Sequence, residues 1–145
     1  MINEEQMLNS ICETADMGRE SLKQVLEKTD DNGLKGALRA QISEYDNDYN
    51  LALEMLQQSG LKGKHPKARP MTKAESQVTV NLKTAFTQNK ESQIAEMVIQ
   101  GSSMGVVKIT KELNGYNGSN QEVRRLAEKH LQTEQNNIEE MKKFL

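Results

Sequence analysis

Apolar residues recur every three or four positions along most of the chain, and this spacing predicts amphipathic helices. Four long helices are expected, with approximate bounds 3–28, 34–59, 90–113 and 119–145. A short extra helix is expected from Thr72 to Phe86, where Thr72 and Glu75 have the spacing of a capping box. The pattern therefore predicts an all-α protein.

The segments between the helices carry turn-forming residues. Thr29–Gly33 reads Thr-Asp-Asp-Asn-Gly, so a turn is expected there, with a left-handed Gly33 and an acidic cap for the next helix. The stretch 60–70 holds two glycines and both prolines, which predicts a loop. Residues 114–120 contain two glycines among asparagines and serine, which predicts the end of the third long helix. We expect one domain, 1–145, with helix pairs 3–59 and 90–145 joined by the crossover 60–89.

Polar residues interrupt the apolar stripe of two helices. The first polar triplet lies in the second long helix and comprises Gln41, Tyr45 and Asp48. The second polar triplet lies in the last helix and comprises His130, Glu134 and Asn137. At these spacings, members of a triplet share one helix face, so we expect all six in the bundle interior. We call these six residues the polar layer.

The two halves of the chain align as an internal repeat. Met17-Gly18 superposes on Met104-Gly105 at a shift of 87 residues. A shift of 89 superposes the first polar triplet on the second. Two related helix pairs joined by a long crossover predict a bundle in which the crossover travels the length of the molecule.

This arrangement resembles the ferritin-like superfamily, in particular its small bacterial members of unassigned function. The resemblance implies an antiparallel four-helix bundle. It also implies a di-metal site with one Glu from each of the first and third long helices, and a Glu-x-x-His from each of the others.

The residues at those positions depart from the family pattern. Tyr45 and Asp48 occupy the first Glu-x-x-His, Glu134 and Asn137 occupy the second, and only Glu134 matches. At the corresponding level, the interior faces of the first and third long helices offer no carboxylate. The first helix holds Ala15, Gly18 and Leu22 there, and the third holds Ser102, Gly105 and Val106. Two metal ions need several carboxylates to balance their charge, so we expect the di-metal centre to be lost.

Two interpretations of the polar layer remain open. In the first, its members hydrogen-bond to one another: His130 with Glu134, Asp48 with Asn137, or Tyr45 with either carboxylate. In the second, Asp48, His130 and Glu134 hold a single iron or zinc ion. The first interpretation predicts a protein without a cofactor.

A basic loop occupies the crossover and comprises Lys62, Lys64, His65, Lys67 and Arg69. Such a loop would bind phosphate, nucleic acid or an acidic partner, or would simply be solvated. It lacks interleaved aromatic residues and a P-loop ending, so the solvated interpretation is preferred.

Composition narrows the function classes. A formal net charge of −2 argues against nucleic-acid binding over the whole surface, and the lone Cys12 excludes an intramolecular disulfide. We find neither a secretory leader nor a membrane-length apolar run, so a cytoplasmic protein is expected.

No nucleophile stands beside a base in the sequence, which argues against an enzyme. We therefore expect a structural or interaction protein, with a metal-binding protein as the alternative. Gly36 and Gly101 interrupt helical patterns, which suggests helix contacts, including a homodimer contact. The sequence names no other protein partner.

Overall fold

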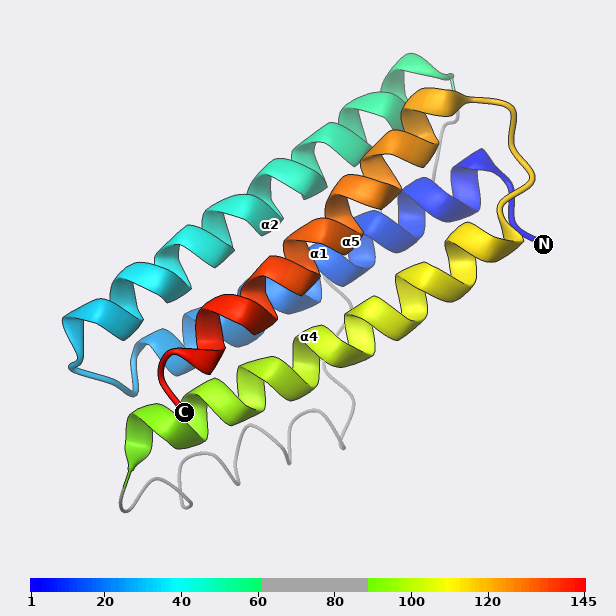
Figure 1. Ribbon diagram of the computed structural model, residues 1–145. Coiled ribbons are helices and arrows are strands. Elements are labelled where there is room, and N and C mark those ends of the chain that lie inside the picture. Colours follow the sequence, from blue (N-terminus) through cyan, green and yellow to red (C-terminus); the bar gives the residue numbers. More distant parts are fainter. Residues whose placement is uncertain (61–88) are drawn as a thin grey trace, which may run out of the picture.

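The protein is described by a computed structural model covering residues 1–60 and 89–145 (Figure 1). Within these residues, four helices account for the ordered structure and no strand is formed. They are α1 (Glu4–Leu26), α2 (Asn32–Gln58), α4 (Lys90–Gly115) and α5 (Gln121–Lys142). The expected short helix and the basic loop lie outside the described residues.

The helices form two antiparallel pairs, α1 with α2 and α4 with α5, packed side by side. Figure 1 shows that α2 ends at the opposite end of the bundle from the start of α4. Helix α2 also packs against α5, and α1 packs against both α4 and α5. The fold is therefore an all-α four-helix bundle, as the hydrophobic periodicity predicts.

Side chains cap three of the helices. At the start of α1, the Gln6 amide donates to Asn3 Oδ1 at 2.8 Å, and the Asn3 amide donates to Gln6 Oε1 at 2.9 Å. Asp31 accepts from the Leu34 amide at 2.8 Å, which confirms the expected acidic cap of α2. Asn120 caps α5 in the same way. Such caps satisfy amides that the first helical turn leaves unpaired.

Two local expectations need correction. Gly33 was expected in a left-handed turn but lies in the first turn of α2, because the cap at Asp31 starts that helix earlier. Among the described glycines, the positive φ belongs to Gly60, at 64°. The predicted last helix extends to Leu145, but α5 ends at Lys142 and Leu145 is exposed.

The apolar core consists of two clusters. One lies at the end of the bundle where α1 begins and includes Met7, Leu8, Ile11, Leu56 and Val123. The other lies towards the opposite end and includes Leu22, Leu34, Leu38, Ile94 and Met141. Along both α2 and α5, the polar layer falls between residues of the two clusters.

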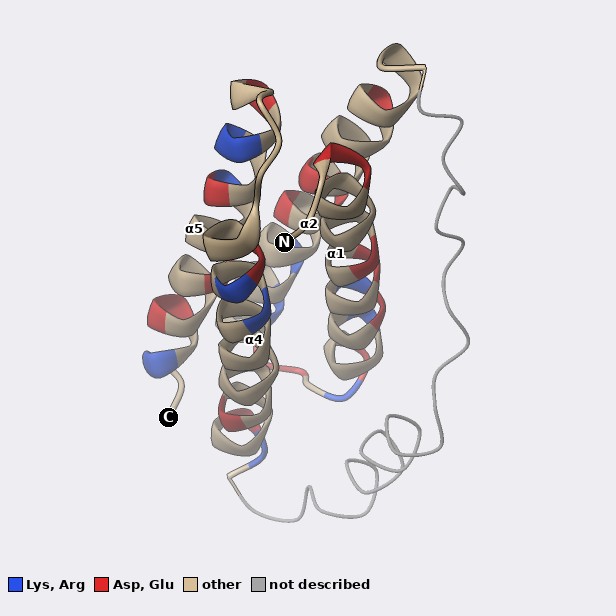
Figure 2. Ribbon diagram, turned by 90° about the vertical axis from the view of Figure 1, so that its right-hand side faces the viewer, with Lys and Arg blue, Asp and Glu red and all other residues tan. Residues whose placement is uncertain are grey.

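Charged residues are distributed along all four helices, as Figure 2 shows. The helices are amphipathic, with apolar stripes turned towards the core. Among the described helices, we find none that combines the length and the apolar character of a membrane span.

Candidate polar site in the bundle interior

The six members of the polar layer are all buried, with exposed fractions between 0 and 4%. Three come from α2 and three from α5. Because these helices run antiparallel, Asp48 lies at the level of His130 and Tyr45 at the level of Glu134. Gln41 and Asn137 occupy corresponding places one turn further along. The layer is thus a set of polar positions between two packed helices.

Asp48 and His130 form the best-defined contact of the layer. Asp48 Oδ2 lies 2.9 Å from His130 Nδ1, and Asp48 Oδ1 accepts from Lys129 Nζ at 2.8 Å. Burial alone would raise the pKa of Asp48, but the hydrogen bonds from His130 and Lys129 outweigh it and lower that pKa. The ionised carboxylate can only accept, so Nδ1 carries the hydrogen of this contact.

Tyr45 and Glu134 form the second contact. The Tyr45 hydroxyl hydrogen-bonds with Glu134 and also interacts with Ser102 and Asn137. Burial raises the pKa of Glu134 to about 7, with the Tyr45 hydrogen bond and His130 acting in the opposite direction. Burial and the neighbouring Glu134 charge raise the pKa of Tyr45 as well. The Glu134 carboxyl group therefore titrates near neutral pH.

Several buried polar atoms of the layer have no hydrogen-bond partner among the described residues. They are His130 Nε2, Glu134 Oε1, Asn137 Nδ2 and both amide atoms of Gln41. A buried polar atom left unpaired is costly, which makes this level of the bundle chemically distinct from the apolar clusters on either side. His130 and Glu134 each retain one free ligating atom.

Two glycines line the layer from the other two helices. A Cβ atom on Gly18 of α1 would lie 2.7 Å from the Tyr45 ring. A Cβ atom on Gly105 of α4 would overlap the Glu134 carboxylate. The large side chains on α2 and α5 therefore fill the space that side chains from α1 and α4 would otherwise occupy.

The contacts differ in part from the expected pairs. Tyr45 does meet a carboxylate, that of Glu134. Asp48 does not pair with Asn137, because His130 and Lys129 engage its two oxygens. Among the described contacts, His130 and Glu134 interact electrostatically and share no hydrogen bond.

The donor set does not fit a di-metal centre. In the described part of the chain, no three His, Cys, Asp or Glu residues are placed to hold a metal ion together. Both Asp48 oxygens already accept hydrogen bonds, so Asp48 is placed to orient His130. The free atoms on His130 and Glu134 would supply two ligands, fewer than the three or four of typical zinc sites.

Sequence reasoning missed two polar partners. The Lys129 side chain is exposed yet reaches the buried Asp48. Its position off the apolar stripe gives no sign of this contact. Asp16 is buried on α1, where it binds Arg19 at 2.6 Å. The spacing of Asp16 and Arg19 is a visible signal for a helical ion pair, but burial is not visible in the sequence.

One solved structure resembles this fold closely. It is the crystal structure of a DUF305 fragment from Deinococcus radiodurans, with a TM-score of 0.72. The alignment covers 97% of this chain and 93% of that chain, at 16% sequence identity. At this identity the likeness establishes the fold alone.

No curated protein matches the sequence. A family model, described as a domain of unknown function (DUF2383), matches residues 3–115. The matched region includes α1, α2 and α4, and therefore the first polar triplet, but ends before α5. Because the match spans most of the chain, this protein belongs to the DUF2383 family.

Proposed function

We propose that this protein is a ferritin-like bundle, folded as one domain, in which the polar layer has replaced the di-metal centre. We further propose that it acts in the cytoplasm as a non-enzymatic structural or interaction protein. In this proposal the polar layer fixes the register of α2 against α5. Polar residues in helical cores can serve such a registering role.

The glycines opposite the layer carry the proposal. A metal-binding bundle of this kind needs a carboxylate from each of the first and third long helices. At the level of Tyr45 and Glu134, those helices present Gly18 and Gly105, and even a Cβ atom would collide there. The space for the two missing carboxylates is filled by other side chains.

The same glycines support an internal duplication. Gly18 abuts Tyr45 and Gly105 abuts Glu134. These are equivalent pairs in the proposed repeat, since a shift of 87 relates the glycines and one of 89 relates Tyr45 to Glu134. A duplicated bundle that lost its metal-binding function would lack a carboxylate at the equivalent position of each half.

A mononuclear metal site is the alternative function. Its support is the pair of free atoms, His130 Nε2 and Glu134 Oε1, on successive turns of α5. Asp48 holds the other ring nitrogen of His130, as carboxylates commonly do for metal-binding histidines. An iron or zinc ion bound by these two atoms would take its remaining ligands from groups other than Asp48, His130 and Glu134.

Metal analysis of the purified protein separates the two functions. The chain is expressed without an affinity tag in medium containing iron, zinc and manganese, and its metal content is measured by elemental analysis. We expect much less than one metal ion per chain. We also expect His130→Ala to lower the free energy of unfolding by about 1–3 kcal/mol, because it removes a hydrogen-bond partner of the buried Asp48 carboxylate.

The variant His65→Ala is the control, since His65 is the other histidine of the chain. One metal ion per chain, lost in His130→Ala and retained in His65→Ala, would refute the metal-free bundle and establish the alternative. Metal retained in His130→Ala would mark binding outside the polar layer, and the proposal would stand.

A further inference from the structure

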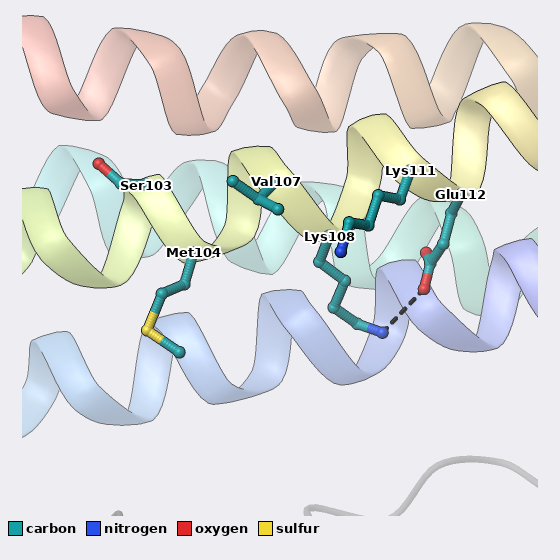
Figure 3. Close-up of a pocket in the computed structure, with 6 residues that line it drawn as sticks. All are labelled: Ser103, Met104, Val107, Lys108, Lys111 and Glu112. Carbon is teal, nitrogen blue, oxygen red and sulfur yellow. Dashed lines mark hydrogen bonds and ion pairs between the residues drawn. The ribbon is translucent and has the colours of Figure 1, made fainter.

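The outer side of α4 carries an exposed apolar patch. Met104 and Val107 have exposed fractions of 74 and 54%, high values for large apolar side chains. Figure 3 shows both along α4 together with Lys111, and all three help to line a surface pocket. Within the described structure, no other helix covers this patch. Exposed apolar patches with a charged rim are characteristic of interaction surfaces.

The patch belongs to a longer outward stripe of α4. At 100° per residue, Glu96, Gln100, Met104, Val107 and Lys111 fall within about 80° of one another, opposite the buried residues of α4. All five are exposed. The stripe therefore has an apolar centre, with an acidic residue at one end and a basic residue at the other.

Within residues 1–60 and 89–145, neither end charge has an ion-pair partner. Lys108 pairs with Glu112 at 2.8 Å, but Glu96 and Lys111 form no ion pair with any described residue. They are separated by 15 residues, or about 22 Å of helix. The midpoint between them falls between Ser103 and Met104. A stripe with opposite charges at equal distances from an apolar centre is complementary to itself when reversed.

We propose that a second copy of this chain binds this stripe, with the two α4 helices antiparallel about a twofold axis beside Ser103 and Met104. Glu96 then faces Lys111 of the partner subunit, and Gln100 faces Val107 of the partner subunit. The twofold axis repeats each contact, so two ion pairs flank one apolar centre. This inference names a partner for the interaction role proposed above.

The association is expected to be weak. A single helix pair over four turns buries less than the roughly 1,200 Å² of a standard stable interface. The exposed glycine beside the stripe, Gly101, would allow close approach, since nothing in its own chain lies within 4 Å of a Cβ placed there. A reversible dimer with a dissociation constant of about 10–100 μM fits this size.

Sedimentation velocity over a concentration series tests the association. The wild-type chain is expected to shift from monomer to dimer as its concentration rises through the dissociation constant. Glu96→Lys and Lys111→Glu each place like charges opposite one another twice, and each is expected to weaken the dimer about tenfold. The double variant Glu96→Lys with Lys111→Glu restores opposite charges and is expected to recover wild-type affinity.

The matched control is Glu128→Lys, which reverses an exposed acidic residue on α5. It should leave the dissociation constant unchanged. Circular dichroism of each variant checks that the helix content is retained, so that loss of dimer is not loss of fold.

A cysteine cross-link tests the position of the twofold axis. Ser103→Cys places a thiol beside the axis, and mild oxidation is expected to join two chains through a disulfide. Cys12 does not compete, because it is buried and burial raises its pKa to about 12. The control variant Ser43→Cys, exposed on α2, should cross-link at least tenfold more slowly.

A chain that remains monomeric at several hundred micromolar would overturn the inference, as would equal cross-linking at positions 43 and 103. A dimer insensitive to both charge reversals would overturn the antiparallel α4 contact. A monomer would leave the proposed loss of the di-metal centre unaffected, because metal analysis tests that proposal separately.

Discussion

At the scale of single residues, Gly105 shows how the smallest side chain determines what the interior contains. Glu134 lies against the backbone of α4 at this point, and a Cβ atom there would overlap its carboxylate. Glu134 cannot retreat freely, because it is buried and hydrogen-bonded to Tyr45. The absence of a side chain on α4 is therefore a condition for the polar layer.

Gly105→Ala is expected to lower the free energy of unfolding by about 1–3 kcal/mol, because it overpacks the layer. Gly36→Ala is the control: a Cβ there has nothing within 4 Å, and alanine favours the helix by up to about 1 kcal/mol. Chemical denaturation of both variants measures the difference. Equal effects at the two positions would show that Gly105 is not packed against Glu134.

At the scale of helices, Arg19 joins α1 to α2. Its guanidinium binds Asp16 of its own helix at 2.6 Å and Asp46 of α2 at 3.0 Å. It also stacks over the Tyr49 ring at 4.3 Å. Asp16 is buried, and Arg19 supplies its ion-pair partner. The periodicity of the chain predicts both helices, but it does not predict which side chains join them.

Arg19→Ala is expected to lower the free energy of unfolding by about 1–3 kcal/mol, since it leaves the buried Asp16 carboxylate without its partner. The control Lys23→Ala removes an exposed pair with Glu20, at 3.5 Å, and should change stability by less than about 0.5 kcal/mol. Thermal and urea unfolding measure both. A similar loss in the two variants would contradict the role of Arg19.

At the scale of the whole molecule, the buried carboxyl of Glu134 couples folding to pH. Its pKa rises from 4.5 to about 7 on folding. Between these values the unfolded chain loses a proton that the folded chain keeps, so ionisation favours unfolding as the pH rises. The groups facing Glu134 are Tyr45 and Asp48 from α2 and His130 from α5.

We therefore expect the contribution of Glu134 to stability to be fully present below pH 4.5 and to be lost as the pH rises through 7. The loss amounts to about 3 kcal/mol from the shift in pKa. Glu134→Gln removes this titration while keeping a similar shape. Urea unfolding of both proteins from pH 4 to 8 should show a stability difference that changes with pH. A constant difference across this range would contradict the raised pKa.

The sequence alone determined the four long helices, the acidic cap of α2 and the polar and apolar residues that face inward. These follow from local spacing: a period of 3.6 residues, a capping side chain next to the first turn and glycine-rich breaks. Tertiary structure decided which inward residues meet. Asp48 pairs with His130 and Lys129 because α2 and α5 run antiparallel at one level, a relation between distant segments that periodicity does not encode. The lack of room for a side chain at Gly18 and Gly105 likewise depends on how closely α1 and α4 approach their neighbours.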